Sequence, residues 1–317
     1  MHSKWFSEPE PAYAELVTRL YGLRTGDQLN RVYRDELCQR ALWAPRLDWS
    51  GIAIYDADGI RAHAVVQVIR DRPLVYVGYV EAVDDPTAAG LLVREVRAAL
   101  ERTHPGRTIY LPVNLSIWHT YRFKTSGDTC LPFDPPCQPY YGALFAPFFD
   151  GQELYSSYRF AVPSSDRLEG VQQPFTVREI SLQRLAQELR SIYEMALAVF
   201  QDAHSFPSFE EFAAIYGSAA GSINPRYILV AEADEQPIGF IFALPLGQAV
   251  YIKTFAVAPS AQNHHVGRLL YETICRRARA DGYQTLYGLL IKNDRLITRL
   301  LPPGAQKVAE YTLYRGE

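Results

Sequence analysis

Three separate blocks of the sequence recur in the same order, at a nearly constant offset, in its second half. These pairs are Asp56-Ala57-Asp58 with Glu232-Ala233-Asp234, Tyr76-Val77 with Tyr251-Ile252, and Thr108-Ile109-Tyr110 with Thr285-Leu286-Tyr287. Each half also ends alike, with Tyr155-Ser156-Ser157-Tyr158-Arg159 against Tyr311-Thr312-Leu313-Tyr314-Arg315. Such a repeat indicates one folding module that is present twice.

Hydrophobic patterning predicts the same kind of module in both halves. The first half shows a meander of strands over residues 51–55, 62–70 and 74–82, a helix over 86–103 and a strand over 108–113. The second half predicts strands over 175–180, 227–233, 238–244, 251–257, 285–292 and 307–314, with helices over 182–201, 208–216 and 293–301. Two further helices, over residues 9–21 and 28–41, are expected to cover the first module. The fold class is therefore α/β, with a mixed sheet in each module.

The length of 317 residues also favours two domains. A Pro-bounded polar stretch lies between the two copies of the module. We therefore predict a first domain over residues 1–162, a linker over 163–174 and a second domain over 175–317.

The stretch from Ala249 to Ala280 is the most informative one for function. An apolar run is stopped by Pro259, and an amphipathic helix begins after the turn Gln262-Asn263-His264-His265-Val266-Gly267. Free backbone N–H groups and the positive end of the helix dipole favour a phosphate or pyrophosphate at such a turn. Arg268 adds a positive charge beside it. An ordinary strand–turn–helix connection is the alternative interpretation.

This pattern resembles the acyl-CoA signature of the GNAT N-acetyltransferase superfamily. Gln262 and Gly267 match that signature, and His265 stands where the family has its first Gly. His tolerates positive φ better than most residues but less well than Gly, so a slightly altered turn is expected at His265. The resemblance covers about residues 175–315, and for 50–160 it rests on the repeat.

The resemblance implies two tandem GNAT-like modules, of which the first is degenerate and the second transfers an acetyl group from acetyl-CoA to an amine. It implies that strands part beside Val257 and that backbone N–H groups there polarise the thioester. The residues expected to contact acetyl-CoA are Phe255, Ala256, Val257, Gln262, Asn263, His264, His265, Val266, Gly267, Arg268 and Asn293.

The catalytic residues do not follow from the resemblance. Leu300 stands where the family often has a tyrosine acid, and residues 249–261 contain no Asp or Glu. His119 and Tyr121, in an aromatic insertion over residues 114–136, are weak candidates for the proton acceptor, although packing is the commoner role for such a His. A non-catalytic acyl-CoA-binding or sensing protein and an aminoacyl transferase of the tandem-GNAT type are therefore alternatives.

Charge and composition limit the classes of molecule that the chain is expected to bind. A net charge of −3 and a pI near 6.2 argue against a nucleic-acid partner. The chain shows neither a signal-peptide core nor a membrane-length apolar run, so a cytoplasmic protein without a membrane partner is expected. The spacing of Cys130 and Cys137 does not suit zinc, and no metal is expected. Asp84 and Asp85 replace the phosphate-binding turn in the first copy, so one acetyl-CoA per chain is expected.

Overall fold

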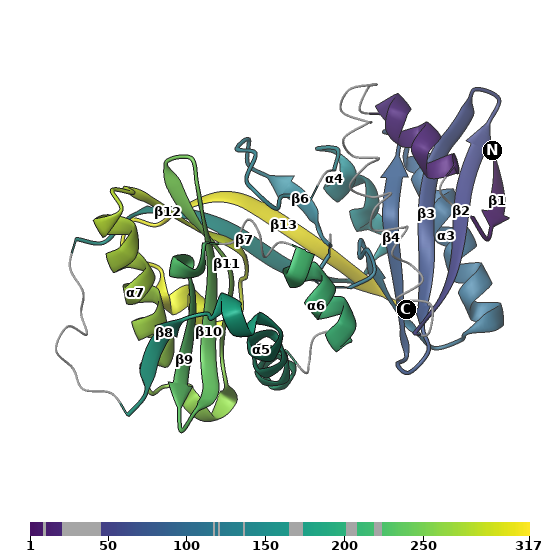
Figure 1. Cartoon of the computed structure of the whole chain (residues 1–317). Helices are drawn as coiled ribbons and strands as arrows, with labels where there is room; N and C mark the ends of the chain where they lie inside the picture. The colour runs from purple at the N-terminus through teal and green to yellow at the C-terminus, as the bar shows by residue number, and fades with distance from the viewer. Residues whose placement is uncertain are drawn as a thin grey trace. The chain divides into compact units, whose positions relative to one another are not determined.

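The structure is a computed structural model that describes residues 1–8, 11–20, 46–116, 118–119, 121–135, 137–164, 174–200, 208–218 and 224–317. It contains two compact units (Figure 1): unit 1 is Met1–Leu154 with Tyr311–Glu317, and unit 2 is Tyr155–Glu310. The helix expected over 28–41 and most of the linker expected over 163–174 lie outside the described residues. No helix among the described residues is long and apolar enough to cross a membrane.

Unit 1 is built on the predicted meander. The strands β1 (His2–Phe6), β2 (Leu47–Asp56), β3 (Gly59–Ile69) and β4 (Leu74–Ala82) pair antiparallel in this order, and β5 (Thr108–Leu111) runs parallel to β4. The helix α3 (Pro86–Thr103) connects β4 to β5 and buries Leu92, Val96 and Leu100 against the sheet. Smaller elements are a helix over residues 11–20, β6 (Phe123–Ser126), α4 (Tyr141–Phe145) and η1 (Ala146–Phe148). The strand β1 was not predicted, because its residues do not alternate between apolar and polar.

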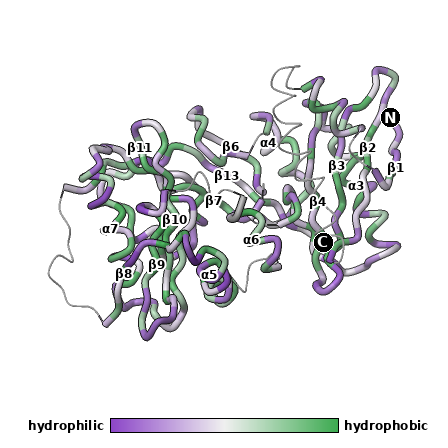
Figure 2. Tube along the Cα trace, in the orientation of Figure 1, coloured by the Kyte–Doolittle hydropathy of each residue, from purple (hydrophilic) through white to green (hydrophobic). Residues whose placement is uncertain are grey.

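Unit 2 has a second mixed sheet with helices on both faces. The strands β8 (Thr176–Glu179), β9 (Ile228–Ala233), β10 (Gln236–Leu246) and β11 (Ala249–Val257) pair antiparallel, and β12 (Thr285–Lys292) runs parallel to β11. Residues of β10 alternate between the faces: Ile241 packs with α7 (Val266–Ala280), and Phe240 and Phe242 face α5 (Leu185–Val199) and α6 (Phe209–Ser218). Short 3-10 turns are η2 (Leu182–Arg184), η4 (Pro225–Tyr227), η5 (Pro259–Ala261) and η6 (Leu296–Leu300). The central strands of each unit are coloured largely as hydrophobic in Figure 2, in agreement with these cores.

The last strand of each sequence copy completes the sheet of the other unit. The strand β7 (Gly151–Ala161) follows the first copy, but from Tyr155 on it pairs antiparallel with β12 of unit 2. The strand β13 (Gln306–Gly316) follows the second copy, but its residues from Tyr311 on belong to unit 1, where Tyr314 pairs with Leu111 of β5. The compact units therefore divide at residues 154 and 155, whereas the sequence suggested a boundary at 162.

In unit 2, local sequence signals predicted the start of one helix correctly and a second helix wrongly. The capping box at α6 is present, since Ser208 Oγ accepts from Glu211 N and a Glu211 carboxylate oxygen accepts from Ser208 N. The helix predicted over 293–301 is wrong in type and length, because η6 is a 3-10 turn limited to Leu296–Leu300. Pro302 and Pro303 follow one residue after this turn, and a proline disfavours helical backbone in the residue before it, here Leu301.

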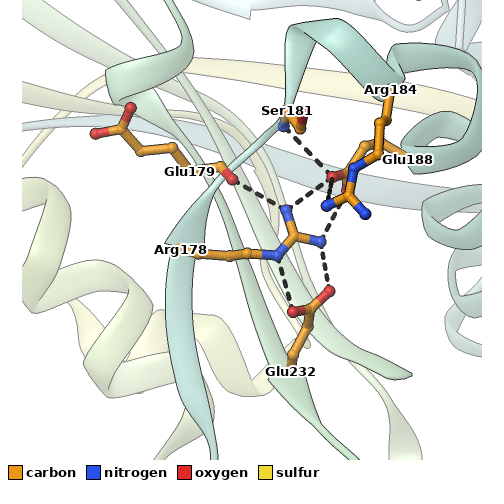
Figure 3. A network of polar contacts seen from close by, with 6 residues as sticks. All are labelled: Arg178, Glu179, Ser181, Arg184, Glu188 and Glu232. Atoms are coloured by element: carbon orange, nitrogen blue, oxygen red, sulfur yellow. Dashed lines mark hydrogen bonds and ion pairs between the residues drawn. The ribbon is translucent and has the colours of Figure 1, made fainter. Parts of the chain in front are cut away.

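An ion-pair network attaches α5 to the sheet of unit 2 (Figure 3). The Arg178 guanidinium donates to both oxygens of the Glu188 carboxylate, at 2.8 and 3.0 Å, and also to both oxygens of Glu232. Glu188 is only 5% exposed, so these hydrogen bonds replace water contacts of its carboxylate. The hydrogen bonds from Arg178 lower the pKa of the Glu232 carboxyl. Arg178, on β8, therefore joins this strand to Glu232 on β9 and to Glu188 on α5.

Candidate functional site

The strands β11 and β12 part in the middle of unit 2. Their parallel pairing runs from Ala249 with Thr285 to Ile252 with Gly288, although β11 continues to Val257 and β12 to Lys292, and all these residues are described. In unit 2, β12 also shifts register against β7 between Gly288 and Ile291. Strand backbone carries donors and acceptors on both edges, so parted strands present groups that can bind an extended ligand.

An exposed turn carries the chain from β11 to α7. Asn263 and His265 both adopt the left-handed conformation, with φ of 66° and 63°. His265, which stands where the signature has a Gly, thus takes the positive φ that a Gly would adopt easily. His265 is also the N-cap of α7, and no side chain in the described part of the chain caps this helix end. Its first N–H groups thus remain available for an anion.

Glycines let α7 approach the sheet closely at this turn. A Cβ on Gly267 would lie 3.2 Å from Phe255 Cζ and 3.4 Å from Val257 Cγ2. A Cβ on Gly239 of β10 would lie 3.0 Å from Val266 Cγ1. The first turn of α7 therefore rests directly on the end of β11.

The residues expected to contact acetyl-CoA fall into two groups in the structure. Gln262, Asn263, His264 and His265 are exposed, and Arg268 and Gly267 are half-buried at the start of α7. Val266 is 1% exposed and packs in the core of unit 2, so only its backbone faces the turn. Phe255, Ala256 and Val257 lie on β11 beyond the parting point, and Asn293 follows the end of β12. Asn293 is exposed, and its Oδ1 accepts a 2.9 Å hydrogen bond from Ser156 Oγ of β7.

The corresponding place in unit 1 is filled by the chain itself. Beyond the pair Tyr76 and Tyr110, Val113 N donates to Val77 O at 3.1 Å, and a Cβ on Gly78 would lie 2.1 Å from Val113 O. Asp85, expected to repel a phosphate, is the N-cap of α3 and accepts from Thr87 N at 2.8 Å. At this place in the module, unit 2 has parted strands and an uncapped α7, whereas in unit 1 the chain fills the gap and Asp85 caps α3.

The two weak catalytic candidates are engaged inside unit 1. His119 Nδ1 lies 3.0 Å from Ser116 Oγ, and the Tyr121 ring lies under the Arg122 guanidinium at 3.5 Å. Both side chains are half-buried. These contacts are those of packing residues, which is the role that the sequence analysis ranked higher for His119.

Sequence reasoning did not identify Lys253 as a candidate. It lies on β11 next to the parting point, and burial lowers its pKa to about 8. A lysine inside a strand of otherwise mostly apolar residues was the available signal. Tyr251 and Tyr287, which pair across β11 and β12, stack at 4.8 Å beside it. In the described part of the chain no cluster of three or more His, Cys, Asp or Glu residues is placed to bind a metal.

A family model described as "Acetyltransferase (GNAT) family" matches residues 189–297, which run from α5 to η6. This segment contains the parting strands, the left-handed turn and the N-terminus of α7. No protein of the curated collection matches the chain.

Solved structures extend the similarity to the whole chain. A GCN5-related N-acetyltransferase from Sphaerobacter thermophilus shares 14% identity, with 99% of this chain and 95% of that one covered and a TM-score of 0.54. A tandem GNAT protein from the clavulanic acid biosynthesis pathway shares 11% identity, with 100% and 98% covered and a TM-score of 0.54. A probable N-acyltransferase from Enterococcus faecalis V583 shares 12% identity, with 99% and 72% covered and a TM-score of 0.59. Residues 189–297 thus match the GNAT family, and the whole chain shares a mixed α/β fold with tandem GNAT proteins.

Proposed function

We propose that unit 2 binds acetyl-CoA and transfers its acetyl group to an amine of a small molecule or protein. The observation that carries this proposal is the succession of parted strands, left-handed turn and uncapped helix within one stretch of chain. Each part of this stretch suits one part of acetyl-CoA. The fold of GNAT acyltransferases agrees with it, since the family takes an acyl-CoA donor and an acceptor.

The residues present fit the donor. The exposed turn at Gln262 to His265 and the free N–H groups of α7 suit the pyrophosphate, and Arg268 adds a cation beside it. The edge of β11 from Phe255 to Val257 suits the amides of the pantetheine arm, because strand backbone pairs with extended chains. Backbone N–H groups near the thioester would stabilise negative charge on its carbonyl oxygen during transfer.

One observation favours a second candidate function, a non-catalytic acyl-CoA-binding or sensing protein. Leu300 lies at the end of η6, where the family often has a tyrosine, and a leucine cannot donate a proton. An aminoacyl transferase of the tandem-GNAT type is a further alternative. It is less favoured, because the turn suits a pyrophosphate and the chain has a net charge of −3.

Two measurements test the proposal. Calorimetric titration of the full chain with acetyl-CoA should show saturable binding, and a screen of primary amines should reveal amine-dependent release of free thiol. Binding without thiol release from any amine would favour the sensing protein. No binding of acetyl-CoA would contradict both functions.

A further inference from the structure

Lys253 occupies an irregular position in β11. The pairing of β10 with β11 joins Phe242 to Thr254 and Ala243 to Ile252, so Lys253 is the extra residue of a bulge. It is also the first residue after Ile252, where the pairing with β12 ends. Bulges redirect a side chain relative to its strand, and they are common beside active sites.

The surroundings of Lys253 are aromatic. Its ammonium nitrogen lies 5.9 Å from the centroid of the Tyr216 ring, on α6. Tyr216 packs in turn on Phe212 at 4.7 Å and on Phe242 at 6.0 Å. Lys253 is thus held against an apolar wall on the face of the sheet that α5 and α6 cover.

This environment disfavours the ammonium form of Lys253. Burial lowers its pKa from the ordinary 10.5 to about 8. Tyr216, whose ring lies against Lys253, stays neutral because burial raises its pKa, and burial likewise raises the pKa of Tyr251 on β11. Near pH 8, Lys253 therefore exchanges a proton readily in a way that an exposed lysine does not.

Transfer of an acetyl group to an amine needs such a group. An aliphatic acceptor amine is an ammonium ion at neutral pH and must lose a proton before its nitrogen can attack. Residues 249–261 offer no carboxylate for this purpose, and His119 and Tyr121 are engaged within unit 1.

We propose that Lys253 is the proton acceptor for the acceptor amine, an inference that rests on the proposed function. Neutral Lys253 takes one proton from the acceptor ammonium. The free amine then forms the C–N bond with the thioester carbonyl carbon, the C–S bond breaks, and the second amine proton passes to the departing thiolate. Lys253 returns its proton to solvent, so the products are the acetamide, the thiol of CoA and one proton.

The competing role for Lys253 is that of a permanent cation that anchors an anionic group of the acceptor. Arginine would preserve that role, because its guanidinium stays charged, but it could not accept a proton. Replacement by Arg therefore separates the two roles, and replacement by Met removes both.

The first experiment needs no acceptor. The full chain is labelled with deuterated acetic anhydride over a pH series, with and without acetyl-CoA, and Lys253 is compared with the exposed Lys307 by mass spectrometry. Labelling of Lys253 should have its midpoint near pH 8, well below that of Lys307. Acetyl-CoA should protect Lys253 from labelling without changing Lys307. Equal labelling of Lys253 at saturating acetyl-CoA would overturn the proposal. Failure of acetyl-CoA to bind in calorimetry would instead refute the proposed function.

The second experiment measures amine-dependent thiol release against pH for the wild type, Lys253→Met, Lys253→Arg and the control Lys307→Met. Both Lys253 variants should lose about 10²- to 10⁴-fold in kcat/KM, the usual contribution of a general base, and Lys307→Met should lose none. The wild-type profile should bend near pH 8, and this bend should be absent from both variants. Retained activity in Lys253→Arg would identify an anchoring cation and overturn the proposal, as would an unchanged bend in Lys253→Met.

Discussion

The side-chain oxygen of Asn114 accepts a 2.7 Å hydrogen bond from the backbone N–H of Tyr79, and both residues are buried. Tyr79 lies three residues after Tyr76, so its counterpart in the second copy is Thr254. In unit 1, the side chain of Asn114 thus satisfies a backbone N–H group at the position that corresponds to the parted strands of unit 2. Gln67 holds the same segment in place, since its side chain donates to Val113 O and accepts from Leu115 N.

The first prediction is that each chain binds one molecule of acetyl-CoA. Asn114 and Val113 occupy the space beside β4, and Asp85 caps the helix that would have to receive the phosphates. Calorimetry at known active concentration should give a stoichiometry of one. A value near two would show that unit 1 also binds the donor.

Asn114 can be tested by its contribution to stability. Asn114→Ala leaves the buried N–H of Tyr79 without its acceptor, which should cost about 1–3 kcal/mol of unfolding free energy. Asn224→Ala is the matched control, because Asn224 also accepts from a backbone N–H but is exposed, and it should cost less. Urea denaturation of both variants measures the difference. Equal costs would contradict the structural role given to Asn114.

A prediction on His265 follows from its left-handed backbone. His265→Val should destabilise the chain by about 1–2 kcal/mol, because a β-branched residue strains at positive φ, and should weaken acetyl-CoA binding. His265→Gly should retain both stability and binding. His264→Val is the control for stability, since His264 is not among the residues with positive φ. Similar melting temperatures for the two valine variants would show that the turn does not need this conformation.

Gly267 tests the pyrophosphate assignment. Gly267→Val places side-chain atoms against Phe255 and Val257 and blocks approach to the helix N-terminus, so acetyl-CoA affinity should fall, with a stability cost of about 1–3 kcal/mol. Gly267→Ala should have smaller effects on both, because Phe255 needs to move by only a few tenths of an ångström. Thermal melts measure the packing cost, and calorimetry measures affinity. Unchanged affinity in Gly267→Val would show that the pyrophosphate lies elsewhere.

The Arg178 network predicts a specific acid sensitivity. Arg178 lowers the pKa of Glu232 below the ordinary 4.5. The stability that this pair gives the folded state is therefore complete above pH 4.5 and is lost as the pH falls through the lower pKa of the folded state. Arg178→Met should cost about 3 kcal/mol at pH 7, because the buried Glu188 loses its bidentate partner and keeps the long contacts to Ser181 N at 3.4 Å and Arg184 at 3.9 Å. The loss of stability between pH 4.5 and lower pH should be smaller in this variant. Arg184→Met, which removes an exposed partner at 3.9 Å, should cost less than about 1 kcal/mol. Equal costs for the two variants would contradict the network.

Local sequence patterns were sufficient to predict most of the helices and strands and the position of the turn before α7. The bounds predicted for the strand over 285–292 and the helix over 86–103 agree with the structure, because each has strong apolar periodicity and clear ends. His265 was recognised by its place in the signature. The acetyl-CoA contacts remain predictions.

The proton affinity of Lys253 could not be predicted from sequence patterns. Its residue type is visible in the sequence, but its proton affinity depends on burial against Tyr216, which lies on a helix separated from it by two strands. Likewise, Asn114 could be placed in an insertion, whereas its hydrogen bond to Tyr79 depends on how that insertion folds back on β4.

The repeat determined by itself that the chain contains two copies of one α/β module and that each copy ends in a similar strand. Only the tertiary structure decided which sheet each last strand completes, with β7 on β12 and β13 on β5. The physical reason is that alternation and β-branched residues specify a strand and its buried face, while the backbone hydrogen bonds that join neighbouring strands are the same for any partner. Two similar edges and two similar strands are therefore indistinguishable in sequence, and the connections and packing of the folded chain choose between them.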